Sequence, residues 1–136
     1  MPTKLPTAAW REQKTEEARK FEAGEITAAE RYMDKLFPDA FIDRTDLLLK
    51  DFAAAINQCS AAAADFPRVM QNIQDVVLAL NKINDDFELR VIETGEREEL
   101  CEFIDSVIIE RGIDIESLAA SQNCTRYELT DEWRDW

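Results

Sequence analysis

The chain has 136 residues, which is enough for one domain and too few for two of ordinary size. It carries 29 Asp and Glu against 16 Lys and Arg, a formal net charge of −13, with a normal apolar share of 46%. It contains no histidine, which excludes imidazole bases, imidazole metal ligands and the Ser-His-Asp and Cys-His nucleophile systems. With only three Gly, turn-rich all-β folds and Gly-rich phosphate loops are disfavoured. We therefore expect one acidic helical domain over residues 1–136.

The first third of the chain predicts two helices. Strong helix formers over residues 7–23 indicate a first helix, which Gly24 ends. Thr27 and Glu30 then have the spacing of a capping box, in which each side chain accepts a hydrogen bond from the other residue's backbone N–H. This predicts a second, short helix that ends at Pro38.

Two longer helices are predicted next. Asp43 or Thr45 can cap a third helix, and apolar residues at helical spacing continue it to Phe66. Pro67 suits the first turn of a fourth helix, over roughly residues 67–84. This fourth helix has a continuous apolar stripe, formed by Val69, Ile73, Val76, Val77, Leu80 and Ile83.

A fifth helix is predicted over residues 96–111, before Gly112. Between it and the fourth helix, residues 87–93 alternate apolar and charged side chains, which fits either a short strand or an extended link. A single strand without a partner gives little support for a sheet.

The C-terminal residues show less order. Residues 113–129 have no sustained period, and a last turn is predicted to start at Thr130, capped by its hydroxyl. Trp133 and Trp136 are expected to anchor this segment to the core. The predicted fold is therefore all-α, a compact bundle of about five helices with an irregular C-terminal segment.

The cysteines and the N-terminus indicate a cytoplasmic protein. Cys59, Cys101 and Cys124 are odd in number and irregularly spaced, which is typical of small buried apolar residues in a reducing compartment. Neighbouring glutamates are expected to raise the pKa of the Cys101 thiol, which disfavours a catalytic role. The first residues lack the apolar core of a signal peptide, and no apolar run approaches the ~18 residues that span a bilayer.

Charge is distributed unevenly along the chain. Residues 85–136, here called the acidic portion, hold 16 of the 29 acidic and only 5 of the 16 basic side chains. Nearly all of the net negative charge therefore lies in the last 52 residues. A requirement for solubility alone would not gather the acids in one part of the chain.

The fifth predicted helix carries an acidic stripe. At ~100° per residue, Glu98, Glu102 and Asp105 share one side, opposite the apolar residues that are expected to face the core. Ile109 lies within the same stripe, and an apolar side chain among carboxylates resembles an interface anchor with a steering rim. A solvated face with one exposed apolar residue is the alternative explanation. In a third explanation, the C-terminal segment covers Ile109.

Two acidic motifs suggest a possible chemistry. Glu98–Glu102 reads E-E-x-x-E, and Glu128–Asp131 reads E-x-x-D. This pair resembles the signature of the all-α nucleoside triphosphate pyrophosphatases, whose carboxylates hold Mg²⁺ against the phosphates. The resemblance implies a catalytic Mg²⁺ site at those residues. The second motif precedes a terminal turn, whereas the family carries both motifs on long helices.

An acidic surface favours a basic partner. The net charge disfavours nucleic acid and membrane surfaces, because both are themselves negatively charged. In overall charge and helix content the chain is similar to the immunity proteins that neutralise bacterial toxins. Residues 92–98 and 129–136 also resemble segments of small bacterial proteins.

We expect a non-enzymatic binding protein, namely an immunity or inhibitor protein for a basic partner such as a toxin or nuclease, with no cofactor, metal or catalytic residue. The alternatives are the Mg²⁺-dependent pyrophosphatase and a structural subunit or homodimer that buries Ile109 and the tryptophans. The predicted contact residues are Glu98, Glu102, Asp105 and Ile109, with Asp85, Asp86 and Glu88 as rim charges.

Overall fold

The computed structural model describes residues 4–87 and 90–136, apart from the Lys35 side chain. Over these residues the chain forms six α-helices and three 3₁₀ turns, and no strand is assigned. The elements in chain order are α1 (Pro6–Glu22), η1 (Ala28–Glu30), α2 (Tyr32–Leu36), α3 (Asp39–Asn57), η2 (Ala63–Asp65), α4 (Phe66–Asp85), α5 (Thr94–Glu110), α6 (Ile115–Ser121) and η3 (Arg126–Glu128). The all-α fold class predicted from the sequence is confirmed.

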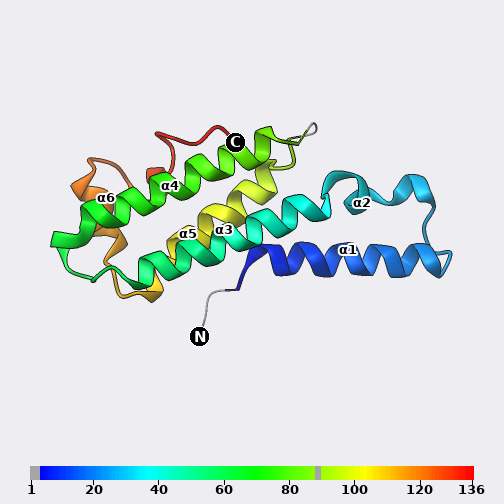
Figure 1. Cartoon of the computed structure of the whole chain (residues 1–136), viewed down its shortest axis with the longest axis horizontal. Helices are drawn as coiled ribbons and strands as arrows, with labels where there is room; N and C mark the ends of the chain where they lie inside the picture. The colour runs from blue at the N-terminus through cyan, green and yellow to red at the C-terminus, as the bar shows by residue number, and fades with distance from the viewer. Residues whose placement is uncertain (1–3, 88–89) are drawn as a thin grey trace.

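Three long helices make the body of the molecule (Figure 1). α3 and α4 pack antiparallel, and α5 returns in the direction of α3. α1 packs against α3 and α5 near its start and then extends past them, carrying α2 beside it. α6 lies at the opposite end of the bundle, and the C-terminal residues run back along α4.

The helices share one buried cluster. Trp10 of α1 is 1% exposed and lies 5.9 Å from the ring of Phe41 and 5.6 Å from that of Phe37. The apolar stripe predicted for the fourth helix is buried throughout, with Ile73 and Leu80 fully enclosed. Burial of the stripes holds the helices together, because isolated helices of this length are marginal in water.

The third helix has different limits from those predicted. α3 begins at Asp39, directly after Pro38, so Asp43 and Thr45 lie inside the helix and cap nothing. It ends at Asn57, nine residues before Phe66. The carbonyls just beyond that end accept hydrogen bonds from arginines of α4 and the α5–α6 turn: Arg68 Nη1 to Gln58 O (3.0 Å) and Arg111 Nε to Cys59 O (2.8 Å). These hydrogen bonds fix the end of α3, and the local sequence pattern does not predict them.

Part of the region predicted to be irregular is helical. α6 begins after Asp114, whose carboxylate accepts hydrogen bonds from the backbone N–H groups of Glu116 and Ser117. Ile115, Leu118 and Ala119 are buried at helical spacing. A helix of seven residues is too short to produce a sustained period in the sequence.

The short strand considered for residues 87–93 is not seen at Phe87 or at residues 90–93, and residues 88–89 lie outside the described residues. Arg90 has a left-handed φ of 44°, which interrupts an extended path. The backbone N–H of Ile92 donates to Asn84 Oδ1 (2.9 Å) instead of to a neighbouring strand. The part of the chain that the structure describes offers no partner strand, and residues 90–93 bury Val91 and Ile92 against the helices.

The predicted turn at Thr130 is also placed differently. The capping residue is Thr125, which forms a capping box with Glu128 around η3, whereas the Thr130 side chain is buried. The tryptophans do anchor the chain end, as predicted: Trp136 is 8% exposed in the core cluster and Trp133 packs against that cluster.

Among the described residues, no helix is long and apolar enough to cross a membrane.

Candidate functional site

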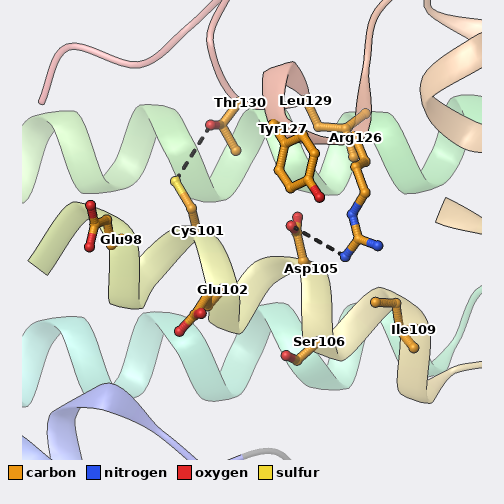
Figure 2. A pocket seen from close by; sticks show the side chains of 10 residues that line it. All are labelled: Glu98, Cys101, Glu102, Asp105, Ser106, Ile109, Arg126, Tyr127, Leu129 and Thr130. Carbon is orange, nitrogen blue, oxygen red and sulfur yellow. Dashed lines mark hydrogen bonds and ion pairs between the residues drawn. The ribbon is translucent and has the colours of Figure 1, made fainter. Parts of the chain in front are cut away.

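A groove of about 640 Å³ lies between α5 and the segment that follows α6 (Figure 2). One wall is α5, which contributes Glu98, Glu102, Asp105 and Ile109. The structure therefore brings together, on a single concave surface, the four residues predicted to be the main contacts. The opposite wall is formed by Arg126, Tyr127, Leu129 and Thr130 from residues 126–130, and Cys101 and Ser106 complete the lining.

The local sequence explains why α5 presents these residues. Its start is fixed by a capping box between Glu93 and Glu96. Its other face is anchored in the core, because Leu100, Ile104 and Ile108 are fully buried. With that face fixed, residues half a turn away must point outward, as the helical period predicts.

The second wall is held by short-range and long-range contacts. Glu128 accepts hydrogen bonds from the backbone and hydroxyl of Thr125 (3.0 and 2.9 Å), which lowers the pKa of the Glu128 carboxyl. Leu129 is buried, and Thr130 Oγ1 lies 3.8 Å from Cys101 Sγ on α5. These contacts set the width of the groove.

Asp105 is the most enclosed carboxylate of the groove. Its side chain is 19% exposed, and the nearest cation, Arg126, places Nη2 3.9 Å from Asp105 Oδ2. Burial raises the pKa of Asp105 to about 6, because this long ion pair only partly compensates for lost hydration and Glu102 adds repulsion. The carboxylate is thus under-compensated when it is ionised.

Glu98 and Glu102 are exposed on the same face and have no basic partner among the described residues. The reason is that every arginine of the acidic portion already holds another group of the chain. The pairs are Arg90 with Asp85 and Asp135, Arg97 with Trp136 O, Arg111 with Cys59 O, Arg126 with Asp105 and Glu116, and Arg134 with Asp131. The negative charge of the groove is therefore left for solvent or for a partner.

Two exposed apolar side chains line the groove. Ile109 is 46% exposed, so the C-terminal segment does not cover it. Tyr127, 79% exposed, extends from the opposite wall beside Arg126, whose guanidinium carbon lies 5.5 Å from the ring centroid. Sequence reasoning missed Tyr127. The available signal was the Thr125–Glu128 spacing, which predicts a one-turn helix that displays the residues between them.

The predicted rim charges do not join the groove. Asp85 is paired with Arg90, and Asp86 is paired with Arg44 and Lys82 at 2.9 and 3.2 Å, which lowers the pKa of Asp86. Both lie at the end of α4, and neither lines the groove. Glu88 lies outside the described residues.

Three carboxylates of the two acidic motifs each interact with a different group of the chain. Glu99 accepts a hydrogen bond from Trp10 Nε1 (3.2 Å), and Glu128 accepts one from the backbone N–H of Thr125. Asp131 forms an ion pair with Arg134 at 2.9 Å. Within the described residues, no cluster of three or more Asp, Glu or Cys side chains is placed to hold a metal ion. No observation in this part of the chain favours the pyrophosphatase hypothesis, which stays a prediction.

The Cys101 thiol has a raised pKa, as the sequence predicted, but for a different reason. Burial is the main cause, and the acidic contributors are Asp105 and Asp131. Hydrogen bonding to Thr130 and the charge of Arg134 act in the opposite direction. A thiol held protonated in this way is a weak nucleophile. Of the three free cysteines only Cys59 is fully buried, whereas Cys101 and Cys124 are half-buried.

The fold and the groove define an acidic all-α protein with an open, partly apolar groove on its acidic portion. The chain belongs to a protein family described as a family of unknown function (DUF5713), whose model matches residues 22–123. The match includes all of α5 and ends before the second wall of the groove. Searches of curated proteins and of solved structures gave no match.

Proposed function

We propose that the protein is a non-enzymatic binding protein that takes a basic protein partner in the groove between α5 and residues 126–130. The observation that carries the proposal is the combination, in one groove, of unpaired carboxylates with two exposed apolar side chains. Each element alone is common on protein surfaces, but together they have the composition of an interface.

The carboxylates supply attraction at a distance. Glu98 and Glu102 lack neutralising partners among the described residues, and Asp105 is only weakly compensated by Arg126. A groove of one sign of charge raises the rate of encounter with an oppositely charged partner. Such attraction weakens with added salt, because exposed charges are screened over about 8 Å at physiological ionic strength.

Ile109 and Tyr127 supply contact area after docking. Both lie beside the carboxylates, so a partner that seats a basic side chain in the groove also covers them. Burial of a tyrosine or isoleucine at the centre of an interface contributes more affinity than a salt bridge at its rim.

A basic partner suits this surface better than a second copy. A symmetric dimer through the groove would place the same carboxylates against each other, which is repulsive. A nucleic acid would meet the same repulsion. An inhibitor of a basic toxin or nuclease, the role of an immunity protein, requires a surface of this sign. We also place the protein in the bacterial cytoplasm, a location supported by its three free thiols.

The test is to capture partners from cells that make the protein and then to measure the affinity of the purified partner. The groove variant carries Glu98→Gln, Glu102→Gln and Asp105→Asn, which preserve side-chain shape. The control variant loses three exposed carboxylates outside the groove, through Glu22→Gln, Asp51→Asn and Asp75→Asn. Both variants change the net charge equally.

We expect a basic partner whose Kd weakens at least about tenfold in the groove variant, equivalent to about 1.4 kcal/mol, and much less in the control. The Kd should also weaken with added salt. Equal effects of the two variants would show that net charge alone matters. A partner unaffected by both would place the interface elsewhere, and either result would overturn the proposal.

A further inference from the structure

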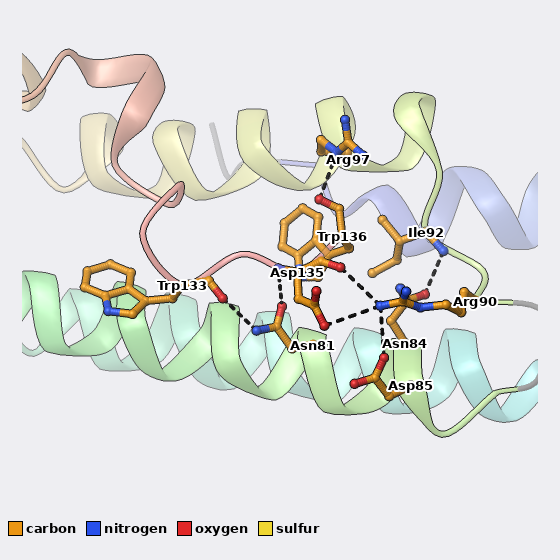
Figure 3. Close-up of polar contacts among 9 residues, drawn as sticks. All are labelled: Asn81, Asn84, Asp85, Arg90, Ile92, Arg97, Trp133, Asp135 and Trp136. Atoms are coloured by element: carbon orange, nitrogen blue, oxygen red, sulfur yellow. Dashed lines mark hydrogen bonds and ion pairs between the residues drawn. The ribbon is translucent and has the colours of Figure 1, made fainter.

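The C-terminal residues 133–136 lie along the seam between α4 and α5, where side chains of both elements and their connection hold them (Figure 3). Most of these contacts are made to backbone atoms. The seam lies beside the acidic groove. Asn81, Arg90 and Arg97 do not line that groove, but Arg134 Nη1 donates to Cys101 Sγ (3.9 Å), which does.

The side chain of Asn81 both donates a hydrogen bond to, and accepts one from, the backbone of residues 133–136, here called the tail. Its Nδ2 donates to the carbonyl of Trp133 (2.7 Å), and its Oδ1 accepts from the N–H of Asp135 (2.9 Å). The side-chain amide thus pairs with one carbonyl and one N–H on the two sides of Arg134, as a neighbouring strand would. Recognition of this kind selects an extended peptide backbone without regard to its side chains.

Two arginines continue the backbone contacts. Arg97 Nε donates to Trp136 O (3.0 Å). Arg90 Nη2 donates to Asp135 O (3.2 Å) and lies 3.4 Å from the Asp135 carboxylate, while Asp85 holds the same nitrogen at 3.1 Å. The seam therefore also selects a carboxylate at the position before the last aromatic residue.

Trp136 provides the apolar anchor and also reveals an imperfect fit. Its ring is 8% exposed within the core cluster. Its indole Nε1 is buried and has no hydrogen-bond partner among the described residues. An unpaired buried donor costs free energy. The N–H of the Trp136 indole therefore makes the binding of residues 133–136 in the seam less favourable than it could be. A peptide whose aromatic residue carries no such donor avoids this cost.

We propose that the α4–α5 seam is a peptide-binding site for an extended segment in which an acidic residue precedes a large aromatic one, and that residues 133–136 are its ligand in cis. A segment of another protein with the same chemistry then competes with the tail. The tail has the advantage of tethering, since a short link gives an effective concentration in the millimolar range.

The experiment uses the full-length chain and a fluorescent synthetic peptide with the sequence of residues 131–136. The Trp136→Ala chain, whose own tail is weakened, is expected to bind the peptide at least about tenfold more tightly than the unchanged chain. Adding Asn81→Ala should weaken that binding at least about tenfold, because one side chain makes two of the backbone bonds. The matched control adds Asn72→Ala, on the same helix, whose amide donates to Arg68 O instead of to the tail.

A peptide with Ala in place of its last Trp should bind at least about tenfold more weakly. If Trp136→Ala unfolds the chain, Asp135→Pro is used instead. Proline lacks the backbone N–H that donates a hydrogen bond to Asn81 Oδ1, and this variant keeps Trp136. If the variant with the weakened tail, Trp136→Ala or Asp135→Pro, did not bind the peptide, the proposal would be overturned. Equal binding by the Asn81 and Asn72 variants would overturn it too.

Discussion

Two largely buried carboxylates, Asp46 on α3 and Asp105 on α5, have opposite electrostatic environments. The Asp46 side chain is 11% exposed and that of Asp105 is 19% exposed, so both have lost most of their water. Burial raises the pKa of Asp46, but hydrogen bonds from Lys50 and Thr7 and the charge of Arg11 outweigh it, and the net pKa is lowered. Around Asp105, burial dominates and the pKa is about 6.

The difference lies in the partners. Asp46 accepts from Thr7 Oγ1 at 2.6 Å and from Lys50 Nζ at 2.8 Å, whereas the only cation near Asp105 among the described residues is 3.9 Å away. Asp46 therefore joins α3 to α1, through Thr7 and Arg11. The acidic portion leaves Asp105 without adequate compensation, in the groove that we propose as the binding surface. Asp46 therefore stabilises the fold, whereas Asp105 lies in the surface that we propose for binding.

The largest expected effect is the contrast between the same substitution at these two sites. Asp46→Asn should destabilise the fold by about 2 kcal/mol, because Lys50 and Arg11 lose the charge they share. Asp105→Asn should stabilise it by about 1 kcal/mol, because an amide is less costly to bury than an ionised carboxylate. Urea unfolding near neutral pH measures both. Equal destabilisation by both variants would contradict the comparison.

The second prediction concerns pH. The folded-state pKa of Asp105, about 6, lies above its ordinary value of 3.8, so between these values the folded chain binds more protons than the unfolded chain. Its contribution to stability therefore falls as pH rises through that interval, by on the order of 2 kcal/mol, and is constant above it. The lowered pKa of Asp46 gives a contribution that is present above the ordinary pKa and is lost as pH falls through the folded value.

The measurement is the free energy of unfolding of the unchanged chain and of Asp105→Asn, each at about pH 4.5 and about pH 7.5. The variant should lose less stability on going to the higher pH. Glu99, whose pKa is also raised by burial, contributes in the same direction in both chains and cancels in the difference. Identical pH profiles would show that Asp105 does not titrate in this interval.

The third prediction separates binding from stability with two equally exposed apolar residues. Ile109 in the groove is 46% exposed, and Leu78 on α4 is 45% exposed. Ile109→Ala should weaken partner binding by about 1.4 kcal/mol, about tenfold in Kd, whereas Leu78→Ala should leave it unchanged. Calorimetry with the captured partner measures both. If Leu78→Ala weakened binding as much, the partner would not be seated in the groove.

The fold class and the stripe on α5 could be predicted because both depend on local periodicity. Leu100 and Ile104 indicate the buried face, and the positions of Glu98 and Glu102 follow from 3.6 residues per turn. The end of α3 could not be predicted in this way. Arg111, distant in the sequence, binds the carbonyl of Cys59 and helps to fix that end.

The candidate site was predicted only on its α5 side. Residues 126–130 form the second wall because a Thr125 capping box folds them back toward Cys101, and their sequence has no apolar period. The rim charges show the opposite error. Asp86 looks free in the sequence, but Arg44, 42 residues earlier, neutralises it. Local patterns predict which way a helix faces, whereas pairing between distant elements decides which charges remain available.

The smallest expected effect tests whether the acids of α5 repel one another. Glu102 lies four residues from Glu98 and three from Asp105, so Glu102→Gln should stabilise the chain by a few tenths of a kcal/mol. Glu16 on α1 is the matched control position, because it forms an ion pair with Arg19 at 2.7 Å. The Glu16→Gln variant should therefore be slightly less stable than the unchanged chain. Thermal unfolding at low salt measures the difference in sign. The difference should shrink at high salt, since both interactions are between exposed groups and are screened. A loss of stability at both positions would mean that the α5 carboxylates are compensated after all, and the groove would then have no charge to offer a basic partner.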